Sequence, residues 1–211
     1  MLFRSVGMVG IVDDITKVCG QGWQTTGDRI YLLGTPLNPL LEGAGVGSGS
    51  VTLGASEYLA TLHQTVAGQP PTVNFDLELK VQAACREGIR NGWIQSAHDS
   101  SEGGLATALA ECCISGKKGA NINLGQISDR HDTALFGEGG ARIIVSIPPT
   151  RQPEFEVYLG QKLGNAWQYL GEVGSSTDSF QINSGDNSIV SLDVAAITHT
   201  WSTAIERRLD V

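Results

Sequence analysis

The sequence predicts an α+β fold organised around one main sheet. Segments whose apolar residues recur at helical spacing alternate with short apolar runs typical of strands. Toward the end of the chain, several strand-like runs follow one another with only short polar turns between them, which favours α+β or a mixed α/β sheet. The chain has 211 residues, of which 41% are hydrophobic, so it can bury a sizeable core.

The first predicted strands lie at residues 6–12 and 29–33. A buried-looking strand so close to the first residue is unusual for the start of a domain. We therefore interpret residues 1–27 as the tail of a preceding domain and residues 28–211 as the main domain.

Residues 36–54 form a glycine-rich stretch of low complexity. They contain neither a G-x-G-x-x-G pattern nor a G-K-[ST] motif, so a phosphate cradle is not indicated. The composition favours a mobile loop or an insertion, with a ligand-covering loop as the alternative. The role of the run from Gly43 to Gly49 stays open.

Two helices follow this stretch. Ser56 is expected to cap a helix over residues 56–63, and Asp76 a longer helix that ends at Asn91-Gly92. The apolar face of the longer helix consists of Leu77, Val81, Ala84, Cys85, Gly88 and Ile89. A short strand over residues 93–97 then leads into the part of the chain with the most chemistry.

Residues 96–105 hold three ionisable side chains, His98, Asp99 and Glu102. The two carboxylates are hard oxygen ligands of the kind that Mg²⁺ prefers, usually beside substrate phosphates. The helix that begins near Gly103 offers free N–H groups to an anion, and Gly103 and Gly104 allow a close approach. His98 could hydrogen-bond a phosphate oxygen or orient Asp99.

Both candidate turns in the chain also have a structural interpretation. In the first, Asp99, Ser100 or Ser101 would only cap the following helix, with the glycines completing the turn. The second covers residues 137–142, where Glu138 lies in a glycine turn just before a strand, with Arg142 close by. This turn could contact a ligand or simply form a local ion pair.

The remaining elements complete the sheet and its cover. The helix after the first turn has a buried stripe that includes the adjacent Cys112 and Cys113. We expect further helices over residues 131–136 and 153–163, and strands over residues 120–124, 141–147, 167–173, 179–182 and 188–192. A final helix capped by Asp193 should bury Val194, Ile197, Trp201, Ala204 and Ile205.

Composition narrows the class of protein. The formal net charge of −8 argues against a nucleic-acid partner, because binding a phosphate backbone needs a basic face. The four cysteines include no C-x-x-C pair, so a zinc site is not indicated and a reduced, cytoplasmic compartment is expected. No apolar run approaches the ~18 residues of a membrane span, and residues 1–5 lack the apolar core of a signal peptide.

Four motifs occur in an order that resembles one enzyme family. They are Gly27-Asp28-x-Ile30-Tyr31-Leu32-Leu33-Gly34, Gly54-x-Ser56-Glu57-Tyr58-Leu59, His98-Asp99-x-Ser101-Glu102-Gly103-Gly104-Leu105-Ala106 and Leu135-Phe136-Gly137-Glu138…Arg142. Together they resemble the large subunit of phosphoribosylformylglycinamidine synthase. The resemblance covers essentially the whole chain but only the C-terminal part of that subunit.

This resemblance implies a fold, an activity and partners. The family repeats a two-domain unit also found in aminoimidazole ribonucleotide synthetase, and this chain resembles its last domain, a layered α/β/α sandwich with a mixed sheet. Residues 1–27 would then be the tail of a nucleotide-binding domain. The family converts formylglycinamide ribonucleotide to the amidine with ATP and glutamine-derived ammonia, through phosphoryl transfer. The implied partners are the preceding domains, a glutaminase subunit and a small accessory subunit, with neither nucleic acid nor membrane.

The resemblance also implies site residues. Asp99 resembles a Mg²⁺ ligand at the nucleotide, ATP or ADP, held in the second half of the subunit. The residues that would border this nucleotide are His98, Ser101, Glu102, Gly103 and Gly104. No catalytic residue carries over, because most of them lie in the preceding domains. The family often has Glu-Ser-Gln where this chain has Glu138-Gly139-Gly140, so a polar pair is missing there.

We therefore expect the C-terminal domain of a purine-pathway ligase, folded but inactive by itself. The alternative is a non-catalytic interaction module that docks on related domains and self-associates through an exposed sheet face. A selenophosphate or thiamine-phosphate enzyme of the same superfamily fits the motifs at residues 31–34 and 56–59 less well.

Overall fold

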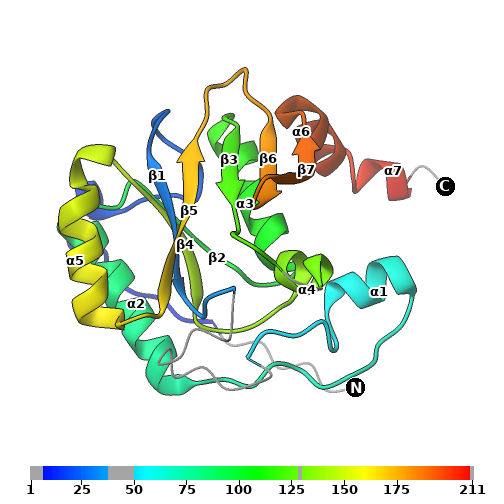
Figure 1. Ribbon diagram of the computed structural model, residues 1–211, viewed down its shortest axis with the longest axis horizontal. Helices are drawn as coiled ribbons and strands as arrows, with labels where there is room; N and C mark the ends of the chain where they lie inside the picture. The colour runs from blue at the N-terminus through cyan, green and yellow to red at the C-terminus, as the bar shows by residue number, and fades with distance from the viewer. Residues whose placement is uncertain (1–6, 38–49, 128–129, 210–211) are drawn as a thin grey trace.

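The computed structural model describes residues 7–37, 50–127 and 130–209, arranged as Figure 1 shows. A seven-stranded sheet has the strand order β2-β4-β1-β5-β3-β6-β7. Neighbouring strands are antiparallel except for β3 and β6, which are parallel. The strands are β1 (Arg29–Gly34), β2 (Ser96–Asp99), β3 (Ala120–Asn123), β4 (Arg142–Ile147), β5 (Trp167–Val173), β6 (Phe180–Ser184) and β7 (Asn187–Leu192).

Helices lie on both faces of this sheet (Figure 1). They are α1 (Glu57–His63), α2 (Phe75–Arg90), α3 (Gly104–Gly116), α4 (His131–Phe136), α5 (Gln152–Leu163), α6 (Val194–Ser202) and α7 (Glu206–Leu209), with short 3-10 helices at Ile15–Lys17 and Pro149–Arg151. The prediction of an α+β layered fold with a mixed sheet is confirmed.

The central strand β1 divides the hydrophobic core into two clusters. Its Ile30 and Leu32 pack with α3 on one face, and its Tyr31 and Leu33 pack with α2 and α5 on the other. All four side chains are fully buried, because successive residues of a strand point to opposite faces. This continuous apolar run is typical of a strand that is covered on both sides.

Most predicted elements are present with small shifts. Ser56 caps α1 as expected, accepting a hydrogen bond from the N–H of Leu59. The cap of α2, however, is Asn74 rather than Asp76, so the helix begins at Phe75. The amide oxygen of Asn74 accepts from the N–H of Leu77, and Asp76 instead supplies negative charge in the first turn.

The strand predicted over residues 6–12 is wrong for the part that the structure describes. Residues 7–12 are irregular and exposed, and no described strand pairs with them. A strand needs a partner for its backbone N–H and C=O groups, and the apolar pattern alone does not supply one. The exposed apolar side chains of this region and the 3-10 helix beside it are Met8, Val9, Ile11, Val12, Ile15 and Val18.

Two other predictions need correction. The strand expected over residues 93–97 lies at Ser96–Asp99, because the N–H groups of Trp93 and Ile94 both bond to Gly88 at the end of α2. Of the side chains expected to be buried by the last helix, Trp201 and Ile205 are instead 62% and 74% exposed, and Ala204 is exposed as well. Trp201 lies in the last turn of α6, which ends at Ser202, and the other two lie beyond that helix.

The glycine-rich run from Gly43 to Gly49 lies outside the described residues. A groove of about 590 Å³ on the sheet is lined in part by the amide side chains of Asn121, Asn123 and Asn183. Among the described residues, no helix is long and apolar enough to cross a bilayer.

Candidate functional site

The turn between β2 and α3, residues 99–104, carries most of the predicted site. It follows β2, the strand at one end of the described sheet, which pairs with β4 so that Asp99 lies opposite Ile143. Gly103 and Gly104 have φ angles of +79° and +73°, which glycine adopts without strain. A Cβ atom on Gly104 would lie 2.7 Å from the carbonyl carbon of Phe136, so the two candidate turns of the sequence touch here.

His98 is directed away from the turn and toward α3. Its Nε2 donates to Oε2 of Glu111 at 2.8 Å, and only 14% of its side chain is exposed. Its Nδ1 lies 3.6 Å from Oδ1 of Asp99. The ring therefore joins β2 to α3, and its second nitrogen faces Asp99 at more than hydrogen-bond distance.

Glu111 is a residue that the sequence prediction missed. It is the one charged residue of α3, which otherwise consists of small, apolar and hydroxyl residues. A lone carboxylate in such a helix is the signal that could have identified it as a partner for a buried polar group.

Asp99, Ser101 and Glu102 are exposed on the turn. The Asp99 side chain is 71% exposed, so its carboxylate is open to a ligand. The backbone carbonyl of Ser101 accepts the N–H of Gly104, and α3 has no side-chain cap. The structural interpretation, in which Asp99, Ser100 or Ser101 caps α3, is therefore wrong.

Glu138, from the turn between α4 and β4 (residues 137–141), occupies the position where we expected an anion. Its Oε1 accepts the N–H groups of Gly103 and Glu57, both at 2.9 Å. Its backbone also pairs with Thr52 in both directions. The carboxylate thus joins the N-termini of α1 and α3, and the Gly103 N–H predicted to face a phosphate already has an anionic partner.

The predicted ion pair between Glu138 and Arg142 is absent. Arg142 is 3% exposed, and its Nη1 donates to the carbonyl oxygen of Gly137 at 3.3 Å. Burial lowers the pKa of the Arg142 guanidinium to about 10, so it stays protonated at neutral pH. Its Nε and the hydroxyl of the neighbouring Ser100 are buried without a hydrogen-bond partner in the described structure.

A groove of about 390 Å³ lies between α1 and the start of α3. The Tyr58 ring stacks on Phe136 at a centroid distance of 5.0 Å and forms part of its wall. Glu102 and Gly103 line the groove, whereas His98 and Asp99 do not. Of the six predicted site residues, the groove is therefore lined by two, Glu102 and Gly103.

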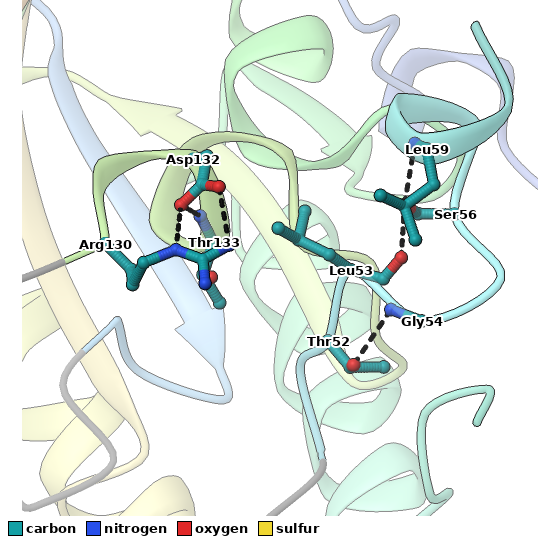
Figure 2. Close-up of polar contacts among 8 residues, drawn as sticks. All are labelled: Thr52, Leu53, Gly54, Ser56, Leu59, Arg130, Asp132 and Thr133. Carbon is teal, nitrogen blue, oxygen red and sulfur yellow. Dashed lines mark hydrogen bonds and ion pairs between the residues drawn. The ribbon is translucent and has the colours of Figure 1, made fainter. Parts of the chain in front are cut away.

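Figure 2 shows the neighbouring segment, from Thr52 to α1 and the start of α4. Ser56 donates to the carbonyl of Leu53 and accepts from Leu59, so the chain enters α1 in a fixed turn. Opposite, both oxygens of Asp132 accept hydrogen bonds from Arg130 at 2.7 Å. These bonds hold the pKa of Asp132 below its usual value. The two sides border a second groove, of about 460 Å³.

The described residues contain no group of three or more His, Cys, Asp and Glu side chains placed to hold a metal ion. The exposed carboxylate of Asp99 fits Mg²⁺ as a single protein ligand, since this ion is commonly held by one or two carboxylates plus phosphates and water. A complete site would need ligands from elsewhere.

Comparison with known proteins agrees with this fold and these motifs. The family described as AIR synthase related protein, C-terminal domain, matches residues 25–182, so the chain belongs to that family. Among its relatives, the phosphoribosylformylglycinamidine synthase subunit PurL of Nostoc punctiforme is 54% identical over 97% of this chain. The PurL subunit of Synechocystis is 50% identical over the same share.

This chain spans about a quarter of the length of these relatives, 25% in both cases. Solved structures share the fold. PurLQS from Thermotoga maritima superposes with a TM-score of 0.60 at 15% identity, covering 86% of this chain and 28% of that one. The hydrogenase maturation protein HypE of Escherichia coli has a TM-score of 0.53 at 13% identity, covering 84% and 52%.

Proposed function

We propose that this chain is the C-terminal part of an ATP-dependent ligase of purine biosynthesis. The enzyme would convert formylglycinamide ribonucleotide to formylglycinamidine ribonucleotide, with ammonia derived from glutamine. The observation that carries the proposal is the 54% identity to a phosphoribosylformylglycinamidine synthase subunit across nearly the whole chain. Asp99 is exposed at the end of β2, so its carboxylate is chemically suited to hold a metal ion in such an enzyme.

In this proposal Asp99 is a ligand of Mg²⁺ at a bound ATP or ADP. When bound, the ion would neutralise phosphate charge. His98, held by Glu111, lies beside the Asp99 side chain. Ser101 and Glu102 would border the nucleotide from the exposed turn. Gly103 and Gly104 would give that turn its shape. Crystal structures of T. maritima PurL with ADP and with ATP support a nucleotide in the larger assembly.

Most of the site would lie outside this chain. Residues 1–27 would be the tail of a preceding nucleotide-binding domain, which fits the start of the family match at residue 25 and the exposed apolar side chains between Met8 and Val18. The further partners would be a glutaminase subunit and a small accessory subunit. The location would be cytoplasmic, with no nucleic acid or membrane involved.

A chimera tests this function. The C-terminal quarter of the Nostoc punctiforme subunit is replaced by this chain, and growth of a purine auxotroph without added purine is measured. We expect growth with the wild-type chain and none, or severely slowed growth, with Asp99→Asn. The matched control is Asp186→Asn, which removes an exposed carboxylate from the turn between β6 and β7 and should leave growth unchanged.

Titration calorimetry of the isolated chain provides the second arm. Mg²⁺ with ATP should bind weakly or not at all, because Asp99 is a single ligand. Substrate-dependent release of ADP by the isolated chain would show that the chemistry does not need the preceding domains, and the proposal would be wrong.

A docking module without a catalytic role is the second candidate. It is favoured by the exposed Trp201, Ile205 and Leu209, which are spaced four residues apart. Besides the exposed sheet face first expected to self-associate, these apolar side chains would offer a surface for the contact. Light scattering distinguishes the candidates: a monomer at high concentration contradicts self-association, and a growing chimera contradicts a purely non-catalytic role.

A further inference from the structure

The described structure contains a buried positive charge that nothing neutralises. Arg142 is 3% exposed and makes no ion pair with any described carboxylate. Burial alone shifts its pKa, and the shift leaves it charged at neutral pH. Removing a charge from water is costly unless it is paired and hydrogen-bonded. A counter-anion is therefore the missing part of this environment.

Ser100, whose hydroxyl has no hydrogen-bond partner in the part of the chain that the structure describes, lies across the strand pair from Arg142. Asp99 pairs with Ile143, so the next residue, Ser100, lies opposite Arg142, and its N–H donates to the Arg142 carbonyl at 2.9 Å. Opposed residues of antiparallel strands project to the same face of the sheet. The Ser100 hydroxyl and the Arg142 Nε, both buried and both without a partner, thus project to the same face of the sheet, the one that α3 covers.

The start of α3 lies against the same guanidinium. Arg142 Nη1 bonds to the carbonyl oxygen of Gly137, and that oxygen is 2.9 Å from where a Cβ of Gly104 would be. No side chain caps α3, and the N–H groups of Leu105 and Ala106 in its first turn have no acceptor among the described residues. Free N–H groups at a helix start attract negative charge.

We propose that Arg142, Ser100 and the first turn of α3 form a binding site for a compact oxyanion, of the size and chemistry of inorganic phosphate. The guanidinium supplies charge and a donor at Nε, Ser100 supplies a hydroxyl donor, and α3 supplies backbone N–H groups. Gly103 and Phe136, which line the groove between α1 and α3, are chain neighbours of Gly104 and Gly137, so the site lies beside that groove. The site is separate from Asp99, whose carboxylate faces solvent, and needs no metal.

Thermal unfolding in increasing inorganic phosphate tests the site, at matched ionic strength against chloride and with EDTA present. The wild-type chain should melt at a rising temperature as phosphate increases, because a ligand that binds only the folded state stabilises it. Arg142→Met should raise the half-saturating phosphate concentration at least about tenfold, the loss expected for charge-assisted hydrogen bonds. Arg151→Met, which removes the same charge from an exposed ion pair, should respond like wild type.

Ser100→Ala provides a milder variant in case Arg142→Met does not fold. It removes only a hydroxyl without a partner, so the fold is retained, and it should raise the half-saturating concentration severalfold. Adenosine monophosphate in place of phosphate distinguishes a free anion from the phosphate group of a larger ligand. A response to phosphate alone indicates a free anion, and a response to both indicates a larger ligand. Either response supports the site if it requires Arg142. Equal phosphate responses of wild type and Arg142→Met would overturn the proposal, as would no response beyond that to chloride.

Discussion

The two turns that meet beside α3 use their carboxylates in opposite ways. In the β2–α3 turn, Asp99 and Glu102 are exposed and accept no hydrogen bond from a backbone group in the described structure. In the α4–β4 turn, Glu138 accepts two backbone N–H groups and joins α1 to α3. The free carboxylates suit a ligand that comes from outside. The bonded carboxylate instead holds Gly103, the residue just before α3, where the sequence had suggested a cap from Asp99.

The point where the turns touch should be the most sensitive to substitution. Gly104→Ala would place a Cβ atom 2.7–2.9 Å from backbone atoms of Phe136 and Gly137, in addition to the cost of a positive φ. We expect the free energy of unfolding to fall by about 3 kcal/mol. Urea denaturation monitored by circular dichroism measures this loss.

Gly92→Ala is the matched control for that substitution. Gly92 also has a positive φ, of +69°, but nothing lies within 4 Å of its Cβ position. It should cost only about 1 kcal/mol. Equal losses for the two variants would mean that the contact between the turns contributes nothing to stability.

Glu138→Ala should have the next largest effect. It leaves the N–H groups of Gly103 and Glu57 without their carboxylate, and we expect a loss of about 2 kcal/mol in unfolding free energy. Glu138→Gln keeps an oxygen acceptor and should lose about half as much. Hydrogen exchange should accelerate at those two amides in particular. Unchanged exchange there would contradict the role of Glu138 in holding the starts of α1 and α3.

The difference between the turns explains which parts of the site could be predicted. The apolar run of β1, the apolar face of α2 and the cap of α1 follow from local rules, and the structure confirms them. The two partners of Glu138 lie 35 and 81 residues away and the partner of His98 lies 13 residues away, so these bonds depend on how the elements pack. Local patterns cannot supply such pairings.

The same reasoning accounts for the failed strand at residues 7–12. Its apolar pattern satisfied the local rule for a strand, but pairing is a property of two segments. Trp201 and Ile205 failed for a related reason, since their helical spacing gives a common face without showing whether anything covers it.

A smaller effect on stability is expected at the ion pair between Arg130 and Asp132, at the start of α4. Arg130 holds the pKa of Asp132 below its usual value, so the pair stabilises the fold above the pKa of an unfolded aspartate. That contribution should disappear as the pH falls through the lower, folded pKa. Because the Arg130 side chain is mostly exposed, Asp132→Asn should cost at most about 0.5 kcal/mol at pH 7 and less at pH 2. An equal loss at both pH values would assign the effect to the Thr133 N–H that Asp132 also accepts.

The smallest change is expected for the carboxylate with the clearest proposed role. Asp99→Asn removes a charge that is 71% exposed and 3.6 Å from His98, so the unfolding free energy should change by less than about 0.5 kcal/mol. Glu102→Ala, in the same turn, should be equally neutral, whereas Glu138→Ala at the adjoining turn should not. A loss of 2 kcal/mol or so on Asp99→Asn would place this carboxylate with Glu138 as a structural group. A neutral result leaves its charge available to a ligand, because nothing in the fold then depends on it.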